Sequence, residues 1–319
     1  MRTKEMTNRH NMIKHIGLLA VGVFFSLSTF AQQEPMFTQY MFNTVAVNPA
    51  YAGTSNALNL VAMSRIQWVG LRGAPVTNTI SMDTPFEGKR VGLGLSVMSD
   101  KIGPVQNLYL SANYAYRVPL NDNITLSLGL KGGIYNYYVG LNSLSLVESN
   151  DAAFYQNQAK ALHPNLGFGA YLYANRWYVG LAVPTLIESD LNKNNTDANN
   201  VSQLKRHYFL MAGYVMHMSA DWDFKPSFIE NVVTGAPPST DLTAQFLYKN
   251  AYWLGTSYRI GDAVAFLFEF KLTEQLMAGY SYDVTVSNLA GHNLGSHEIL
   301  LRYSFDKLSA KKIKSPRYF

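Results

Sequence analysis

The feature that most constrains this chain is an alternation of apolar and small polar side chains that repeats along most of the sequence. Residues 91–97, for example, read Val-Gly-Leu-Gly-Leu-Ser-Val, and residues 124–131 read Ile-Thr-Leu-Ser-Leu-Gly-Leu-Lys. Successive side chains of a β-strand point to opposite faces of its sheet, so each such stretch predicts a strand with one apolar face. Strands of roughly ten residues with this alternation are typical of a transmembrane β-barrel.

The amount of charge in the chain is too low for a soluble protein with so many strands. Charged residues make up 15% of the chain and hydrophobic residues 48%, whereas about a quarter of an ordinary soluble domain is charged. A soluble β-sandwich or a lipocalin-like barrel would also alternate, but it would turn charged side chains outward. Here the polar positions are mostly Gly, Ser, Asn and Thr. We therefore predict an all-β outer-membrane barrel, closed so that every backbone group finds a partner within the sheet.

The expected barrel has about fourteen antiparallel strands, an even number as in single-chain bacterial barrels. Every second connection is short, among them 86–90, 120–123 and 174–176. The connections between them are longer, notably about 139–165 and 184–206, although 70–73 and 260–262 are short. This asymmetry is typical of barrels with short periplasmic turns and long outer loops. The expected strand starts lie near Ala57, Val76, Val91, Asn107, Asn123, Leu166, Trp177, His207, Asp221, Asp241, Tyr252, Ala263, Gln275 and Gly295.

The two ends of the chain differ in composition from the predicted barrel, which covers residues 57–305. Basic residues between Arg2 and Lys14 precede a short apolar stretch and small residues up to Ala31, which is the pattern of a cleaved signal peptide over residues 1–31. Residues 306–319 form a basic C-terminal tail. The signal peptide carries a net charge of +3 and the tail +4, so residues 32–305 carry −2 of the total of +5. The basic excess lies at the ends and gives no reason to expect nucleic-acid binding.

Residues 32–56, ahead of the first strand, do not alternate and are rich in aromatic and amide side chains. So many aromatic side chains would be unfavourable in free solvent. We therefore predict a plug-like segment that packs in or under the barrel lumen. Its candidate plug or partner-binding residues are Gln39, Tyr40, Phe42, Asn43, Asn48, Pro49, Tyr51 and Gly53.

Residues that could carry catalysis or bind a metal are sparse. The chain has no cysteine, which excludes thiol nucleophiles and thiolate metal ligands. Ser296, His297 and Glu298 have the residue types of a hydrolytic triad, but alternation on a strand turns His297 to the opposite face from the other two. The histidines are scattered without the close spacing of a metal site. We expect no enzyme activity, no cofactor and no metal ion.

Several short motifs follow one another along the mature chain. Thr-Gln-Tyr-Met-Phe-Asn at 38–43 and Asn-Pro-Ala-Tyr-Ala-Gly at 48–53 come first. Arg-Ile-Gln-Trp at 65–68, Gly-Ala-Pro at 73–75 and Ser-Asp-Lys-Ile-Gly at 99–103 come next. Trp-Leu-Gly-Thr-Ser-Tyr-Arg at 253–259, Gly-Tyr-Ser-Tyr-Asp at 279–283 and Gly-Ser-His-Glu at 295–298 lie late in the chain. In this order and spacing the motifs resemble those of the PorP/SprF family, outer-membrane proteins of the Bacteroidota type IX secretion and gliding apparatus. The motif positions of interest are Arg65, Gln67, Trp68, Asp100, Lys101, Arg259, Tyr280, Tyr282, Asp283, His297 and Glu298.

Two positions depart from the family pattern. Thr44 stands where the family usually has proline after Phe-Asn, and Leu300 stands where the last strand usually has glycine. The resemblance implies a non-enzymatic role in the cell outer membrane, in contact with its lipid, the secretion pore and the associated motor and ring components. It also implies helping to secrete, hold or anchor a cargo, such as an adhesin with a C-terminal sorting domain. We expect the outer loops or the N-terminal segment to form the contact surface. The alternative is an outer-membrane channel for apolar small molecules, similar to fatty-acid transporters.

Overall fold

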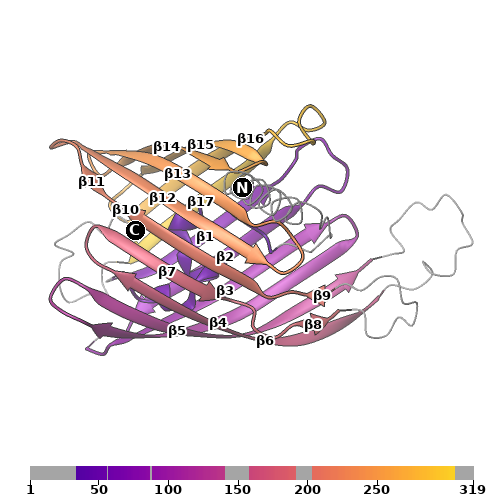
Figure 1. Cartoon of the computed structure of the whole chain (residues 1–319), viewed down its shortest axis with the longest axis horizontal. Helices are drawn as coiled ribbons and strands as arrows, with labels where there is room; N and C mark the ends of the chain where they lie inside the picture. Colours follow the sequence, from indigo (N-terminus) through magenta and orange to yellow (C-terminus); the bar gives the residue numbers. More distant parts are fainter. Residues whose placement is uncertain (1–33, 56, 87, 141–157, 192–202, 306–319) are drawn as a thin grey trace, which may run out of the picture.

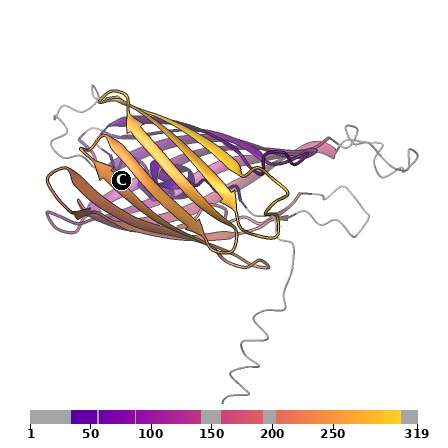
Figure 2. The same cartoon turned by 90° about the horizontal axis from the view of Figure 1, so that it is seen from above.

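The computed structural model describes residues 34–305, apart from residues 56, 87, 141–157 and 192–202 and the side chains of 158–161. The predicted signal peptide and basic tail lie outside the described residues. One sheet closes on itself into a barrel (Figures 1 and 2). Its strands are β1 (Leu58–Ile66), β2 (Val76–Pro85), β3 (Val91–Ile102), β4 (Val105–Pro119), β5 (Thr125–Val139), β6 (Gln158–Tyr173), β7 (Trp177–Val183), β10 (His207–Tyr214), β11 (Met216–His217), β12 (Trp222–Val233), β13 (Ser239–Tyr248), β14 (Tyr252–Arg259), β15 (Ala263–Lys271), β16 (Leu276–Thr285) and β17 (Ser296–Phe305).

Every pair of neighbouring strands in the barrel is antiparallel, and the ring closes where the first strand meets the last. β1 pairs with β17 from Leu58 opposite Phe305 to Ile66 opposite His297. β10 and β11 both pair with β12 and form one wall strand, so the barrel has fourteen strands, as the sequence predicts. This wall strand is interrupted beside Pro226 of β12, because proline has no N–H to donate to the ladder.

The two ends of the barrel differ in the length of their connections. At the short-turn end, residues 86–90, 120–124, 174–176, 218–221, 249–251 and 272–275 join the strands. The long-loop end lies at the right of Figure 1 and carries residues 140–157, 184–206 and 286–295. Within residues 184–206, β8 (Ser189–Asp190) and β9 (Gln203–Leu204) form a small separate hairpin. Residues 103–104 also join two strands at this end, in a tight turn that the sequence did not predict. The β1–β2 connection spans residues 67–75 and is longer than the predicted 70–73, whereas residues 260–262 form a connection as short as predicted.

One strand is longer than the sequence predicts. β6 begins at Gln158, whereas we expected a loop up to residue 165 and a strand start near Leu166. The added residues include Pro164, which pairs opposite Ile134 of β5. They lack clear alternation, which is why the pattern did not predict them as strand. β4, β5 and β6 are the longest strands, and they extend the barrel wall toward the long-loop end (Figure 1).

The outward face of the barrel is apolar and the inward face is polar. Among the strand residues whose side chains are described, Lys101 and Glu230 are the formally charged ones that point outward, and both lie near the long-loop end of their strands. Charged side chains such as Arg65, Lys225 and Glu269 are instead buried inside. No helix among the described residues is long and apolar enough to cross a membrane. Outward-facing aromatic residues lie near both ends, as the interfacial girdles of membrane barrels do: Tyr116, Trp177, Tyr214, Trp222, Tyr252, Tyr303 and Phe305 at one end, and Tyr208 and Tyr258 at the other.

The position of an outward side chain along its strand predicts how strongly a charge there destabilises the protein. Phe266 points outward in the middle of β15, and Gln106 points outward at the long-loop end of β4. We expect Phe266→Arg to lower the free energy of unfolding by about 2–4 kcal/mol and Gln106→Arg by about 0–1 kcal/mol, because the cost of an arginine falls from the bilayer midplane to its interface. Denaturant unfolding in lipid vesicles measures both. Equal losses would contradict this placement of the membrane.

Candidate functional site: a peptide plug in the barrel lumen

The candidate site is the segment Glu34–Ser55, which we call the plug because it lies inside the barrel (Figure 2). It contains three single turns of helix: Tyr40–Phe42, Thr44–Val47 and Pro49–Tyr51. The Asn48 side chain accepts a hydrogen bond from the Ala50 N–H at 3.0 Å. Pro49 occupies the first position of the last turn, where its missing N–H costs nothing. These short turns let the plug change direction repeatedly and fill a narrow lumen.

A buried ion cluster on the barrel wall holds the plug near the long-loop end. Arg65 of β1 bonds Asp283 of β16 at 2.7 Å and Glu298 of β17 at 3.1 Å, and each of the three side chains is at most 2% exposed. The two Glu298 oxygens accept the backbone N–H groups of Thr38 at 2.9 Å and Gln39 at 2.8 Å. The Thr38 hydroxyl donates to Asp283 at 2.8 Å and accepts from Arg65 at 2.9 Å. The wall thus binds two consecutive peptide groups through charge-assisted hydrogen bonds.

Further along the plug, other charged and amide side chains of the wall also bind its backbone. Lys131 of β5 donates to the Ala46 carbonyl at 3.2 Å. At the short-turn end, Asp83 of β2 accepts the Gly53 N–H at 3.0 Å, and Arg117 of β4 donates to the Gly53 carbonyl at 2.6 Å. Acidic side chains therefore take N–H groups of the plug and basic side chains take carbonyl groups. These contacts satisfy buried backbone groups that no helix or sheet pairs.

The side chain of Asn48 makes the reverse contact, from the plug to the wall. Its amide nitrogen donates to the carbonyls of Ala170 in β6 and Leu181 in β7, at 3.1 and 3.2 Å. Asn48 is completely buried. It therefore ties the middle of the plug to two neighbouring strands.

Inward-facing glycines make room for the plug on several strands. A Cβ added to Gly92 of β3 would lie 2.0 Å from the Ala52 carbonyl oxygen, and one added to Gly129 of β5 would lie 2.2 Å from the Ala50 nitrogen. A Cβ on Gly169 of β6 would lie 2.1 Å from the Asn48 side-chain oxygen. Only glycine allows such a close approach of two backbones. These glycines, which look like weak points in a strand, are where the plug packs.

Aromatic contacts fill the remaining space between the plug and the wall. Phe42 packs edge-on against Trp253 of β14, with 6.2 Å between ring centroids, and the Lys225 ammonium lies 5.5 Å from the centre of the Phe42 ring. Tyr51 packs edge-on against Tyr171 of β6 at 5.5 Å. Such pairs add stabilisation beyond burial of their area. Tyr40 and Pro49 are also buried among these residues.

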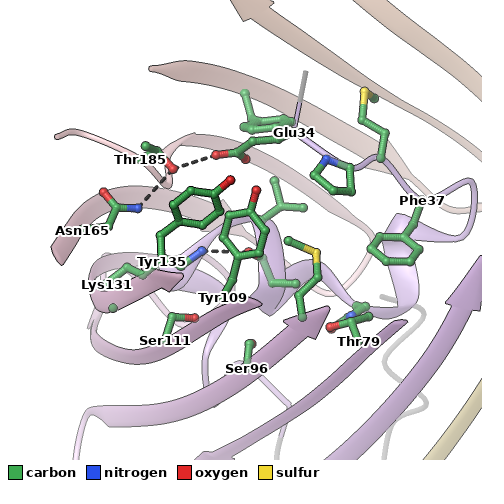
Figure 3. Close-up of a pocket in the computed structure, with 18 of the residues that line it drawn as sticks. Glu34, Phe37, Thr79, Ser96, Tyr109, Ser111, Lys131, Tyr135, Asn165 and Thr185 are labelled. Carbon is green, nitrogen blue, oxygen red and sulfur yellow. Dashed lines mark hydrogen bonds between the residues drawn. The ribbon is translucent and has the colours of Figure 1, made fainter. Parts of the chain in front are cut away.

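A cavity remains between the amino-terminal part of the plug and strands β2–β6 (Figure 3). Its volume is about 70 Å³. The rings of Tyr109 and Tyr135 lie side by side in it, 4.5 Å apart, and Phe37 lies on the opposite side. Asn43 of the plug and Ser96 of β3 add polar groups to a largely apolar lining.

The structure brings some of the sequence-predicted residues together and separates others. Arg65, Asp283 and Glu298 form one cluster, in which Glu298 binds the predicted plug residue Gln39. Arg259 instead pairs with Asp241 at 2.8 Å, through two hydrogen bonds. The remaining predicted residues lie apart from the plug: Gln67 and Trp68 in the β1–β2 connection, Asp100 bonded to Thr77, and Lys101, Tyr280, Tyr282 and His297 on the outward face. As alternation predicts, His297 faces away from Ser296 and Glu298.

Sequence reasoning missed several residues that hold the plug, namely Asp83, Arg117 and Lys131. Each is a charged residue at an inward position of an alternating strand, so strand register alone could have placed it in the lumen. It could not have named the plug atom that each one binds. Among the described residues, no group of histidine, aspartate and glutamate side chains has the arrangement of a metal site.

Comparison with known proteins gives one family and several barrels of similar fold. The model of a family described as "Type IX secretion system membrane protein PorP/SprF" matches residues 29–303. A comparison with curated proteins gives no match. Among solved structures, the chain is similar to the CymD monoaromatic hydrocarbon channel, with 11% identity and a TM-score of 0.49 over 88% of this chain and 96% of that one.

Two further solved barrels are similar at comparable levels. The outer membrane protein Omp33 of Acinetobacter baumannii is 8% identical, with a TM-score of 0.47 over 78% of this chain and 99% of its own. A FadL homologue of Pseudomonas aeruginosa is 11% identical, with a TM-score of 0.42 over 85% of this chain and 94% of its own. At such identities the likeness concerns the fold alone.

Two glycines of β5 allow a direct test of the fit between plug and wall. Gly129 faces the plug, whereas Gly132 faces outward with nothing within 4 Å of an added Cβ. We expect Gly129→Ala to displace the plug, raise the ion conductance of the barrel in a planar bilayer and lower the free energy of unfolding by about 1–3 kcal/mol. Gly132→Ala is the matched control. If the two variants behave alike, the plug does not pack against β5 as described.

The ion cluster predicts a large effect from loss of its only basic member. Arg65→Met leaves Asp283 and Glu298 buried side by side without a cation, so we expect a loss of about 3–5 kcal/mol in the free energy of unfolding. Lys101→Met removes a charge from the outward face and serves as the control, with little expected change. Denaturant unfolding of both variants in vesicles is the measurement. A loss below about 1 kcal/mol for Arg65→Met would argue against the cluster.

Proposed function

The chain belongs to the PorP/SprF family of type IX secretion system membrane proteins, and on that premise we propose that it helps to secrete, hold or anchor a cargo protein in the outer membrane. In this proposal the protein is a non-enzymatic component of the secretion machinery. Its partners are the secretion pore, the associated motor and ring components, and a secreted cargo with a C-terminal sorting domain.

The observation that carries the proposal is the occupied lumen. The plug is bound through its backbone at both ends and in the middle, by Glu298, Lys131 and Asp83 among others. A barrel filled in this way favours a scaffold that binds partners at its ends over an open pore for large molecules. The surface available for a cargo outside the membrane then lies at the long-loop end.

Within that surface we assign the cargo contact to the two longest connections, residues 140–157 and 184–206, together with the N-terminal segment. Thr185, just after β7, donates a hydrogen bond to Glu34 of the plug at 2.6 Å. Asn165 of β6 in turn donates to Thr185 at 3.1 Å. This chain of contacts links the start of the plug to the connection after β7 and to β6, the strand that follows the other long connection, so that the three elements can act as one binding surface.

A second candidate function is a channel for apolar small molecules, and the cavity beside the plug favours it. Met36, Phe37, Met98 and Phe209 give that cavity an apolar lining, which is typical of small-molecule sites. In this alternative the plug would have to shift for a molecule to pass. Uptake or liposome swelling that depends on residues 32–56 would support the channel, and co-purification with a secretion pore without conductance would support the scaffold.

Deletion of the loops tests the cargo contact. We expect removal of residues 141–157 or 192–202 to abolish retention of the cargo at the cell surface, because each deletion removes part of the binding surface but no barrel strand. Heat-modifiable migration on gels should be unchanged and serves as the control for folding. Cargo retention at the level of the unaltered protein in both deletions would refute the loop assignment.

A further inference from the structure

The plug crosses the lumen once, from the long-loop end to the short-turn end. Met36 lies 3.7 Å from the side chain of Asn231, near the end of β12 at the long loops. Thr38 lies at Glu298, the third residue of β17, which also starts at that end. Ala46 lies lower, at Lys131, and Gly53 lies at Asp83, next to the short turn after β2. Successive residues of the plug therefore lie progressively closer to the short-turn end of the barrel.

The barrel itself begins and ends at the other side. Leu58, the first residue of β1, pairs with Phe305, the last residue of β17, at the short-turn end. An even number of strands requires this arrangement. The amino terminus of the plug lies at the opposite end, because the chain passes through the lumen from the long-loop end to the short-turn end before the first strand begins.

The start of the plug is held at the long-loop end from two sides of the barrel. Glu34 accepts the hydrogen bond of Thr185, which follows the long-loop end of β7. On another strand, Asn231 approaches Met36. Figure 3 shows Glu34 beside Thr185 and Asn165, at the rim of the cavity. These contacts aim the amino end of the plug at the outer mouth of the barrel.

We infer that the mature protein presents its amino terminus on the outer side of the membrane, opposite the ends of its first and last strands. The plug then works as a peptide that passes through the lumen, with its amino end offered to a protein partner outside the cell. Such a partner reaches the plug beside the connections that follow β5 and β7. The inference concerns the topology of the chain and does not depend on the cargo role.

The absence of cysteine from the chain makes single-cysteine labelling a clean test. A cysteine at the end of a flexible insert of about ten Gly and Ser residues, placed directly before Glu34, reaches out of the lumen. Asn288→Cys in the exposed β16–β17 connection reports the long-loop end, and Asp122→Cys in the exposed β4–β5 turn reports the short-turn end. Heat-modifiable migration verifies that each variant folds.

We expect a membrane-impermeant maleimide to label the inserted cysteine on intact cells as fully as Asn288→Cys, within about twofold. Asp122→Cys should react only after the outer membrane is permeabilised. An inserted cysteine that is protected on intact cells and reacts together with Asp122→Cys would overturn the inference. A protease site placed in the same insert gives a second readout, since external protease should cut it on intact cells.

Discussion

The rest of this structure depends on the need to pair every backbone polar group in a solvent that offers no partner. Lipid provides no hydrogen bonds, so the sheet must close, and closure requires β1 to meet β17 in register. Closure also sets the composition of the two faces. The outer face is left with apolar side chains and aromatic girdles, and the polar and charged side chains are directed into the lumen, where they face the plug.

The plug presents the same problem on a smaller scale, because its irregular backbone is buried without a sheet to pair it. The wall solves it with side chains whose charge matches the backbone group, as Glu298 does for two N–H groups and Arg117 for the Gly53 carbonyl. Glycines such as Gly129 remove the side chains that would keep the two backbones apart. The polar lumen and the glycine-containing strands are thus one adaptation to a bound peptide.

How much of this could be predicted from the sequence follows from the range of each interaction. Alternation is local, so the strand starts at Val76, Val91, Trp177, His207, Tyr252 and Ala263 were predicted to the residue. The start of β6 was not predicted, because residues 158–165 have no clear alternation of their own. They form a strand because they pair with β5. The cluster of Arg65, Asp283 and Glu298 joins three strands from opposite ends of the chain. Only barrel closure brings those residues together, although the motifs that contain them are visible in the sequence.

The two ends of the plug are held in physically different ways, and this decides which end can move. At the long-loop end, release of Thr38 and Gln39 would leave Arg65 paired with Asp283 and Glu298, so no buried charge would lose its partner. At the short-turn end, the backbone of Gly53 packs closely against the backbones of Gly92 and Thr84. The chain then continues into β1. Any rearrangement of the plug must therefore begin at its amino end. That end adjoins the outer loops, so a partner acting there would meet the part of the plug that the wall can release at least cost.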